Sequence, residues 1–157
     1  MSSRRTAIEP RYQASLDFYE TPAWAVDVLV PHLPDLWRGP VLDPCAGRGA
    51  ILDALEAHGV AGRGIELDPS RAREADLSRP VACDDALALP VRSWCAEPCV
   101  VMNPPFARAE EFVRRALVEV GAGGTVAALL RLAFLEGKAR AALHRVFPAD
   151  VLVLSER

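Results

Sequence analysis

The 157-residue sequence lacks the features that place a protein in a membrane or make its whole surface basic. No apolar run reaches the roughly 18 to 20 residues that a membrane-spanning helix needs. Lysine is nearly absent, because the 18 basic residues are seventeen arginines and Lys138. The net charge is −3 and the pI is about 5.6, which excludes a small basic nucleic-acid-binding protein. Any contact with nucleic acid must therefore come from a local patch.

The sequence also lacks a disulfide framework and a paired metal-binding motif. Residues 1–5 are not followed by the apolar core of a secretory signal, so we expect a cytoplasmic chain whose four cysteines are free thiols. Cys95 and Cys99 have three residues between them, but no second Cys or His pair lies near them in the sequence. We therefore predict no metal site.

The composition is that of a globular domain, with 51% hydrophobic and 25% charged residues. No internal repeat, linker or low-complexity tract divides the chain. We therefore predict a single domain over residues 1–157, in which residues 1–15 form a flexible, basic N-terminal segment.

Short apolar runs alternate with amphipathic stretches along the chain. The apolar runs predict strands at residues 41–43, 64–67, 81–83, 99–102, 124–130 and 151–154. The amphipathic stretches predict helices at residues 50–58, 69–77, 107–120 and 135–146. Thr21 and Pro22 predict the cap and the first residue of an earlier helix. This alternation indicates an α/β fold whose mostly parallel central sheet carries helices on both faces.

A glycine-rich loop, residues 43–49 (DPCAGRG), follows the first predicted strand. In open α/β sheets, ligands bind beyond the carboxyl ends of the strands, and two nearby glycines let the backbone approach a ligand closely. The loop is not a phosphate-binding loop, because no lysine and hydroxyl pair follows it. It is not a full dinucleotide motif either, because Leu52 stands where the third glycine belongs. A plain structural turn is the alternative.

Acidic residues follow the next two predicted strands. Glu66 lies seventeen residues after the glycine loop, where a carboxylate accepts hydrogen bonds from both hydroxyls of a ribose. Asp68 precedes Pro69 and is a natural helix cap. Asp84 and Asp85 follow the third strand, where one of them contacts an adenine edge or both belong to a solvated turn. Which of the two aspartates matters stays open.

The sequence Asn103-Pro104-Pro105-Phe106 follows the fourth predicted strand. Its two prolines fix the backbone and keep it from continuing as a helix. The Asn103 side-chain oxygen and a neighbouring carbonyl can then accept hydrogen bonds from both N–H groups of one amino group. Phe106 offers a flat surface on which a planar amide or base can stack. Such an amino group needs no tuned general base to attack an electrophile, because its proton can leave after the attack.

These segments together resemble the class I S-adenosylmethionine-dependent amino-methyltransferases, most closely the N6-adenine DNA methyltransferases. Residues 43–49 are similar to the family's cofactor loop, and residues 103–106 are similar to its NPPF-type catalytic motif. The resemblance spans roughly residues 16–155 and implies a Rossmann-like class I methyltransferase fold. The last strand of that fold is missing here, because the chain stops before a seventh strand. We therefore expect either a truncated chain or a sheet that is closed by a partner.

The resemblance also implies a binding site for S-adenosyl-L-methionine and a role for each matching residue. Asn103 and the Pro104 carbonyl would hold the target amino group, and Phe106 would stack on the extruded base. The residues with an implied catalytic role are Asn103, Pro104, Pro105 and Phe106. Those with an implied cofactor-binding role are Tyr19, Thr21, Asp43, Pro44, Cys45, Ala46, Gly47, Gly49, Glu66, Leu67, Asp84, Asp85, Ala86 and Asn103. No metal is implied.

The implied activity is direct in-line transfer of a methyl group to the N6 amino group of adenine in nucleic acid, with DNA preferred over RNA. Methylation of RNA adenine or of a protein glutamine amide, and a non-catalytic cofactor-binding partner subunit, are the alternatives. Basic residues in segments 1–11 and 131–145 either border the pocket mouth or form solvated faces. The sequence offers no added recognition module, so we expect a homodimer, a partner subunit or an accessible base. We expect no membrane partner.

Overall fold

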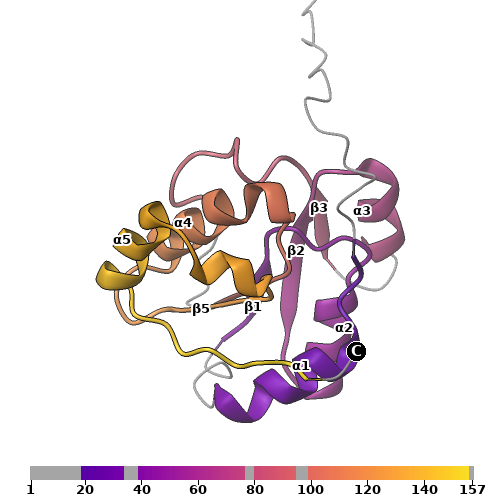
Figure 1. The fold of residues 1–157 in the computed structure, drawn as a ribbon. Coiled ribbons are helices and arrows are strands. Elements are labelled where there is room, and N and C mark those ends of the chain that lie inside the picture. Colours follow the sequence, from indigo (N-terminus) through magenta and orange to yellow (C-terminus); the bar gives the residue numbers. More distant parts are fainter. Residues whose placement is uncertain (1–18, 34–38, 77–79, 95–98, 156–157) are drawn as a thin grey trace, which may run out of the picture.

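The computed structural model describes residues 19–33, 39–76, 80–94 and 99–155. Its centre is a five-stranded sheet with helices packed against both faces (Figure 1). The predicted N-terminal segment 1–15 and Cys95 lie outside the described residues. None of the helices in the described part of the chain is long and apolar enough to cross a membrane.

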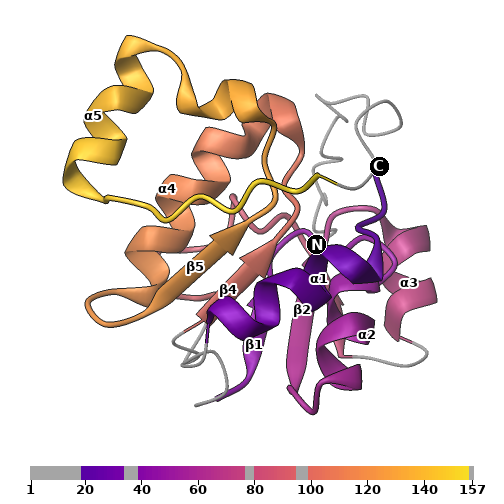
Figure 2. The same ribbon diagram turned by 60° about the horizontal axis from the view of Figure 1, so that its bottom comes forward.

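All strand pairings in the sheet are parallel. The strands are β1 (Val41–Asp43), β2 (Gly62–Glu66), β3 (Val81–Cys83), β4 (Cys99–Met102) and β5 (Thr125–Ala128). Their order is β3-β2-β1-β4-β5, so the chain moves outward from β1 to β3 and then returns to the other side of β1 (Figure 2). This reversal between β1 and β4 creates a crevice at their carboxyl ends, which is where α/β sheets bind ligands.

Helices connect β1 to β2, β2 to β3 and β4 to β5, whereas the described part of the β3–β4 connection, residues 84–94, consists of turns. The helices are α1 (Ala23–Leu29), α2 (Ala50–Ala57), α3 (Pro69–Asp76), α4 (Ala109–Val120) and α5 (Lys138–Val146). Short 3-10 turns lie at η1 (Val30–His32), η3 (Phe106–Arg108) and η4 (Leu132–Leu135).

Alternate strand residues supply two cores, one on each face of the sheet. On β4, Val101 packs with side chains of α1 and α2, whereas Val100 and Met102 pack on the opposite face with side chains of α4. Helix α5 lies outside α4, where Leu143 packs with Ala109 (Figure 2). The sheet is thus covered on both faces, as the sequence predicts.

Most predicted elements are confirmed with shifted ends. The strands predicted at 41–43, 81–83 and 99–102 have these bounds, while the second and fifth strands occupy residues 62–66 and 125–128. The helices predicted at 50–58 and 69–77 end at Ala57 and Asp76. The helices predicted from residues 107 and 135 begin at Ala109 and Lys138, because each is preceded by a 3-10 turn.

The strand predicted at residues 151–154 is wrong, since this segment pairs with no strand of the described sheet. Leu152 and Leu154 instead line an apolar cavity together with side chains of α1, including Val26, and of β4 and β5. Val151 and Val153 are exposed. Leu152 lines the cavity but is itself 38% exposed, so the segment runs across the sheet towards α1 without a hydrogen-bonded ladder and without a fully buried face (Figure 2).

Candidate active site

A pocket opens at the carboxyl ends of β1, β2, β3 and β4. Most of the residues with an implied role line it: Tyr19, Thr21, Asp43, Pro44, Cys45, Ala46, Gly47, Glu66, Leu67, Asp84, Asp85, Ala86, Asn103 and Pro105. Gly49, Pro104 and Phe106 do not line it. Pro104 is fully buried, and Phe106 lies beside Tyr19 with 5.9 Å between the ring centroids.

The glycine loop adopts backbone conformations that only glycine takes without strain. Gly47 and Gly49 have φ values of 56° and 90°, and Gly49 caps the N-terminus of α2. The loop is tied to the neighbouring strand, because Ala46 N–H donates to the Ile65 carbonyl at 2.9 Å. The two glycines therefore place the loop against β2, where its backbone faces the pocket.

Gly64 on β2 makes this close approach possible. A Cβ atom at this position would lie 2.5 Å from the Ala46 Cβ, which is inside van der Waals contact. We expect Gly64→Ala to displace the loop and to lower the free energy of unfolding by about 1–3 kcal/mol, measured by urea denaturation.

Gly62→Ala is the matched control for this substitution, because it makes the same change on the same strand. There the nearest atom is the tip of the flexible Leu52 side chain, at 2.8 Å. If Gly64→Ala is no more destabilising than Gly62→Ala, the loop does not depend on this contact.

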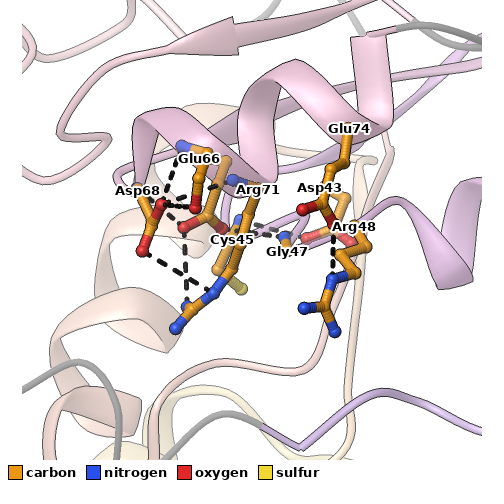
Figure 3. Close-up of polar contacts among 9 residues, drawn as sticks. Asp43, Cys45, Gly47, Arg48, Glu66, Asp68, Arg71 and Glu74 are labelled. Atoms are coloured by element: carbon orange, nitrogen blue, oxygen red, sulfur yellow. Dashed lines mark hydrogen bonds and ion pairs between the residues drawn. The ribbon is translucent and has the colours of Figure 1, made fainter.

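Glu66 is buried, with 7% of its surface exposed, and it connects the loop to α3. Its Oε2 accepts a hydrogen bond from Gly47 N–H at 2.8 Å, and its Oε1 accepts one from Asp68 N–H at 2.9 Å (Figure 3). Arg71 on α3 lies 3.9 Å from Oε1. These contacts fix the carboxylate in place while leaving it lone pairs with which it can accept further hydrogen bonds.

Asp68 is a helix cap, as the sequence analysis suggests. Its Oδ1 accepts hydrogen bonds from Ser70 N–H at 2.8 Å and from the Ser70 hydroxyl at 2.6 Å. These bonds lower the pKa of Asp68. The side chain is thereby occupied at the first turn of α3.

Asp43, at the end of β1, is the most deeply buried acid of the pocket, with 1% of its surface exposed. Its Oδ1 accepts a hydrogen bond from Cys45 N–H at 3.0 Å. The pKa of Asp43 is raised to about 7, because burial and, to a smaller extent, the nearby Glu66 carboxylate raise it by more than the Cys45 hydrogen bonds lower it. Burial also raises the pKa of the Cys45 thiol, so this cysteine is not an activated nucleophile.

Asp84 and Asp85 both border the pocket beyond β3. Asp84 is exposed, and its Oδ1 accepts a hydrogen bond from Asp85 N–H at 2.8 Å. Asp85 is half-buried, and its Oδ1 accepts one from Leu87 N–H at 3.0 Å. Both aspartates thus shape the turn and face the pocket.

The amide of Asn103 has a defined orientation. Its Nδ2 donates hydrogen bonds to the Tyr19 carbonyl at 2.9 Å and to the Thr21 Oγ1 at 3.0 Å. A backbone carbonyl can only accept, so the amide atom that faces it must be the NH2 group. The Asn103 Oδ1 is therefore directed away from these partners.

Thr21 does not cap α1, which corrects the prediction made from the Thr-Pro pair. The N-cap of α1 is Pro22, and the Thr21 side chain, 8% exposed, accepts the hydrogen bond from Asn103 instead. The Thr21 hydroxyl thus accepts a hydrogen bond from a residue 82 positions away, and this tertiary contact takes the place of the local helix cap.

The carbonyls of Pro104 and Pro105 differ in their hydrogen bonding. The Pro105 carbonyl accepts a hydrogen bond from Arg108 N–H at 2.9 Å, which starts the 3-10 turn η3. Within the described part of the chain, no hydrogen bond to the Pro104 carbonyl is found. The end of β4 thus holds two neighbouring acceptors, the Oδ1 of Asn103, which lines the pocket, and the carbonyl of Pro104, which is a buried residue just after it in the chain.

The sequence did not single out several further pocket residues, namely Glu20, Arg48, Ala50, Ile51, Arg71, Arg108 and Phe112. Arg71 had a signal, because it lies three residues after Asp68 on a predicted helix and its Nε approaches the Asp68 Oδ2 at 3.8 Å (Figure 3). Among the described residues, no group of three or more His, Cys, Asp or Glu side chains is placed to hold a metal ion.

No protein-family model matches the chain, and a search of curated proteins gives no match. Solved structures do match most of it. An RNA methyltransferase from Salinibacter ruber, in complex with S-adenosyl-L-homocysteine, is 18% identical with a TM-score of 0.59, over 73% of this chain and 80% of that chain. TrmN from Thermus thermophilus is 27% identical with a TM-score of 0.59, over 88% of this chain and 45% of that chain.

A third similar structure is a subunit of a restriction enzyme. It is a modification subunit assigned to a type I restriction enzyme from Vibrio vulnificus, 16% identical with a TM-score of 0.60, over 86% of this chain and 39% of that chain. The likeness to these proteins confirms the predicted architecture. The chain has the Rossmann-like fold of the class I methyltransferases.

Proposed function

We propose that the chain is an S-adenosyl-L-methionine-dependent methyltransferase that acts on the N6 amino group of adenine in nucleic acid. The orientation of Asn103 carries this proposal, because its Nδ2 is bound to Tyr19 and Thr21 and its Oδ1 is left as an acceptor. The similar structures support it, since one is an RNA methyltransferase with a bound cofactor product and another is a restriction modification subunit.

The acidic residues of the pocket fit the proposed cofactor. A buried carboxyl such as Asp43 suits an ammonium group, because a nearby positive charge favours its ionised form. Glu66 can accept hydrogen bonds from ribose hydroxyls with its remaining lone pairs, and Asp84 or Asp85 can accept one from the adenine amino group. When bound, S-adenosylmethionine supplies a methyl group on a positively charged sulfur.

The proposed role of residues 103–106 is to position the acceptor amino group. The Asn103 Oδ1 and the Pro104 carbonyl accept hydrogen bonds from the two N–H groups of the amino group. These hydrogen bonds direct the nitrogen lone pair towards the pocket. Phe106 stacks on the base, which has left the duplex or is single-stranded. No general base takes a proton from the amino group before it attacks the methyl group. The proton leaves to solvent after the methyl group has moved to the nitrogen.

The acceptor is tested with tritium-labelled S-adenosylmethionine and three separate acceptors: genomic DNA, total RNA and a protein extract. We expect label in nucleic acid. The resemblance of residues 103–106 to DNA enzymes favours DNA, and label in RNA alone would replace that choice. Label in protein alone contradicts the proposal. Cofactor binding by calorimetry without transfer to any acceptor supports a non-catalytic partner subunit instead.

Thr21 positions Asn103 in this proposal. Thr21→Val keeps the shape of the side chain but removes the acceptor of the Nδ2 hydrogen bond. We expect kcat to fall roughly tenfold with little change in the KM for the acceptor, because a lost hydrogen bond to a positioning group acts mainly on the transition state. Thr21→Ser retains the hydroxyl and should restore most of kcat. Equal activity of the Val and Ser variants would show that the Asn103 amide does not need this partner.

A further inference from the structure

Arg131 lies at the acceptor end of the site and has no part in the mechanism described so far. In the register of β4 and β5, Met102 lies opposite Ala128, and the Met102 carbonyl accepts a hydrogen bond from Leu129 N–H at 2.9 Å. Residues 103–106 and 129–131 therefore leave the same edge of the sheet side by side. This brings the Cζ of Arg131 to 3.9 Å from the centroid of the Phe106 ring.

The charge of Arg131 is not neutralised by any described residue, since no described carboxylate lies within 4.0 Å of its guanidinium. Other arginines near the pocket do have acidic partners. Arg48 lies 2.6 Å from Glu74, and Arg108 lies 3.0 Å from Glu111. An exposed guanidinium that no described carboxylate neutralises, beside the proposed acceptor site, is a place where an anion binds.

Stacking on Phe106 leaves the hydrogen-bonding capacity of Arg131 intact. A guanidinium stacks through its flat face, whereas its five N–H donors point outward in its plane. Those donors match two oxygens of a phosphate group. The backbone of Arg131 is fixed just beyond β5, and its long side chain can follow the anion when a base stacks on Phe106.

We propose that Arg131 binds a backbone phosphate that flanks the target nucleotide and thereby positions the acceptor strand. This inference rests on the proposed function and specifies its substrate as a polynucleotide. A flipped base remains joined to its two phosphates through the sugar, so a cation beside the stacking ring is within their reach. A glutamine side chain carries no such anion next to its amide.

The test compares Arg131→Ala with Arg73→Ala in steady-state kinetics on the oligonucleotide that the labelling assay identifies. Arg73 is an exposed arginine of α3, which packs at the opposite edge of the sheet beside β3, so the control removes the same charge elsewhere. For Arg131→Ala we expect KM for the oligonucleotide to rise roughly tenfold, with kcat changed much less. The slope of log KM against log salt should fall in magnitude by about 0.7–0.9, which corresponds to one phosphate contact.

Changing the substrate separates phosphate binding from a structural role. Neutral methylphosphonate linkages on both sides of the target adenine should raise the KM of the wild-type chain roughly tenfold. They should leave the KM of Arg131→Ala nearly unchanged, because the contact is already gone. Arg131→Lys keeps the charge and should restore most of the salt dependence.

Three results would overturn the inference. The first is an Arg131→Ala variant that behaves like Arg73→Ala. The second is a KM effect of the neutral linkages that is equally large in the wild type and in Arg131→Ala. The third is a loss of kcat with unchanged KM, since this would show that Arg131 orients the Phe106 ring. If the wild-type chain methylates no nucleic acid at all, the proposed function fails first, and the inference fails with it.

Discussion

Asn103→Ala should slow methyl transfer severely while leaving the chain able to bind S-adenosylmethionine. The substitution removes the Oδ1 acceptor, so the amino group is held by the Pro104 carbonyl alone. Loss of one preorganised hydrogen-bonding group at a reacting centre lowers kcat by roughly 10²–10³-fold. Single-turnover transfer of labelled methyl groups measures this loss without interference from product release.

Calorimetry with S-adenosylmethionine is the control for this variant. The acids implied in cofactor binding, Asp43 and Glu66, are unchanged, and we expect the Kd to stay within a few-fold of the wild-type value. A variant that retains more than a tenth of wild-type kcat would show that Asn103 does not hold the acceptor. A variant that has lost cofactor binding would place Asn103 in cofactor binding rather than in acceptor positioning.

S-adenosylmethionine should bind more tightly as the pH rises towards 7, because Asp43 must be ionised to complement a cationic ligand. Burial raises the pKa of Asp43 to about 7 in the free protein, so most of this carboxyl is neutral at pH 5.5. Binding then releases one proton, and the affinity should increase roughly tenfold per pH unit below 7 and level off near neutrality. Calorimetric titrations at pH 5.5, 6.25 and 7 measure this slope.

Asp43→Asn is the matched control, since it keeps the shape and the Cys45 contact but cannot ionise. We expect it to bind more weakly at pH 7 and to lose the pH dependence. The same proton affects folding with the opposite sense. The folded-state pKa of Asp43, about 7, exceeds the ordinary value of 3.8. The protonated carboxyl therefore contributes to the stability of the folded protein fully below pH 3.8, and this contribution is lost as the pH rises through 7.

An affinity for S-adenosylmethionine that is constant, or that falls between pH 5.5 and 7, would contradict this role for Asp43.

The sequence predicted the parts of the site that depend on short-range pattern. Short apolar runs located β1, β3 and β4 to the residue, because such runs in a parallel sheet end where the polar motifs begin. The residues that follow the strands therefore lie together at the carboxyl edge of the sheet. Asp43, Glu66, Asp85 and Asn103 line one pocket there.

Features that depend on tertiary partners could not be predicted from local sequence patterns. Thr21 carries the local signature of a helix cap, yet its hydroxyl serves Asn103 across the fold. Residues 151–154 carry the pattern of a strand, yet they pair with no described strand, and Leu152 and Leu154 line the cavity beside α1. Arg131 was one of several cations in a basic segment, and only the register of β4 and β5 shows that it is the one beside Phe106.

The most direct test of the proposed function is to identify the methylated atom. DNA and RNA are incubated with the chain and isotopically labelled S-adenosylmethionine, digested to nucleosides and separated by chromatography with mass detection. We predict labelled N6-methyladenine, in DNA first, in far smaller amount with Asn103→Ala. Label on carbon or on a ring nitrogen would contradict the proposal, because the two acceptors at Asn103 and Pro104 suit an exocyclic amino group. Label on the exocyclic amino group of another base would contradict the choice of adenine.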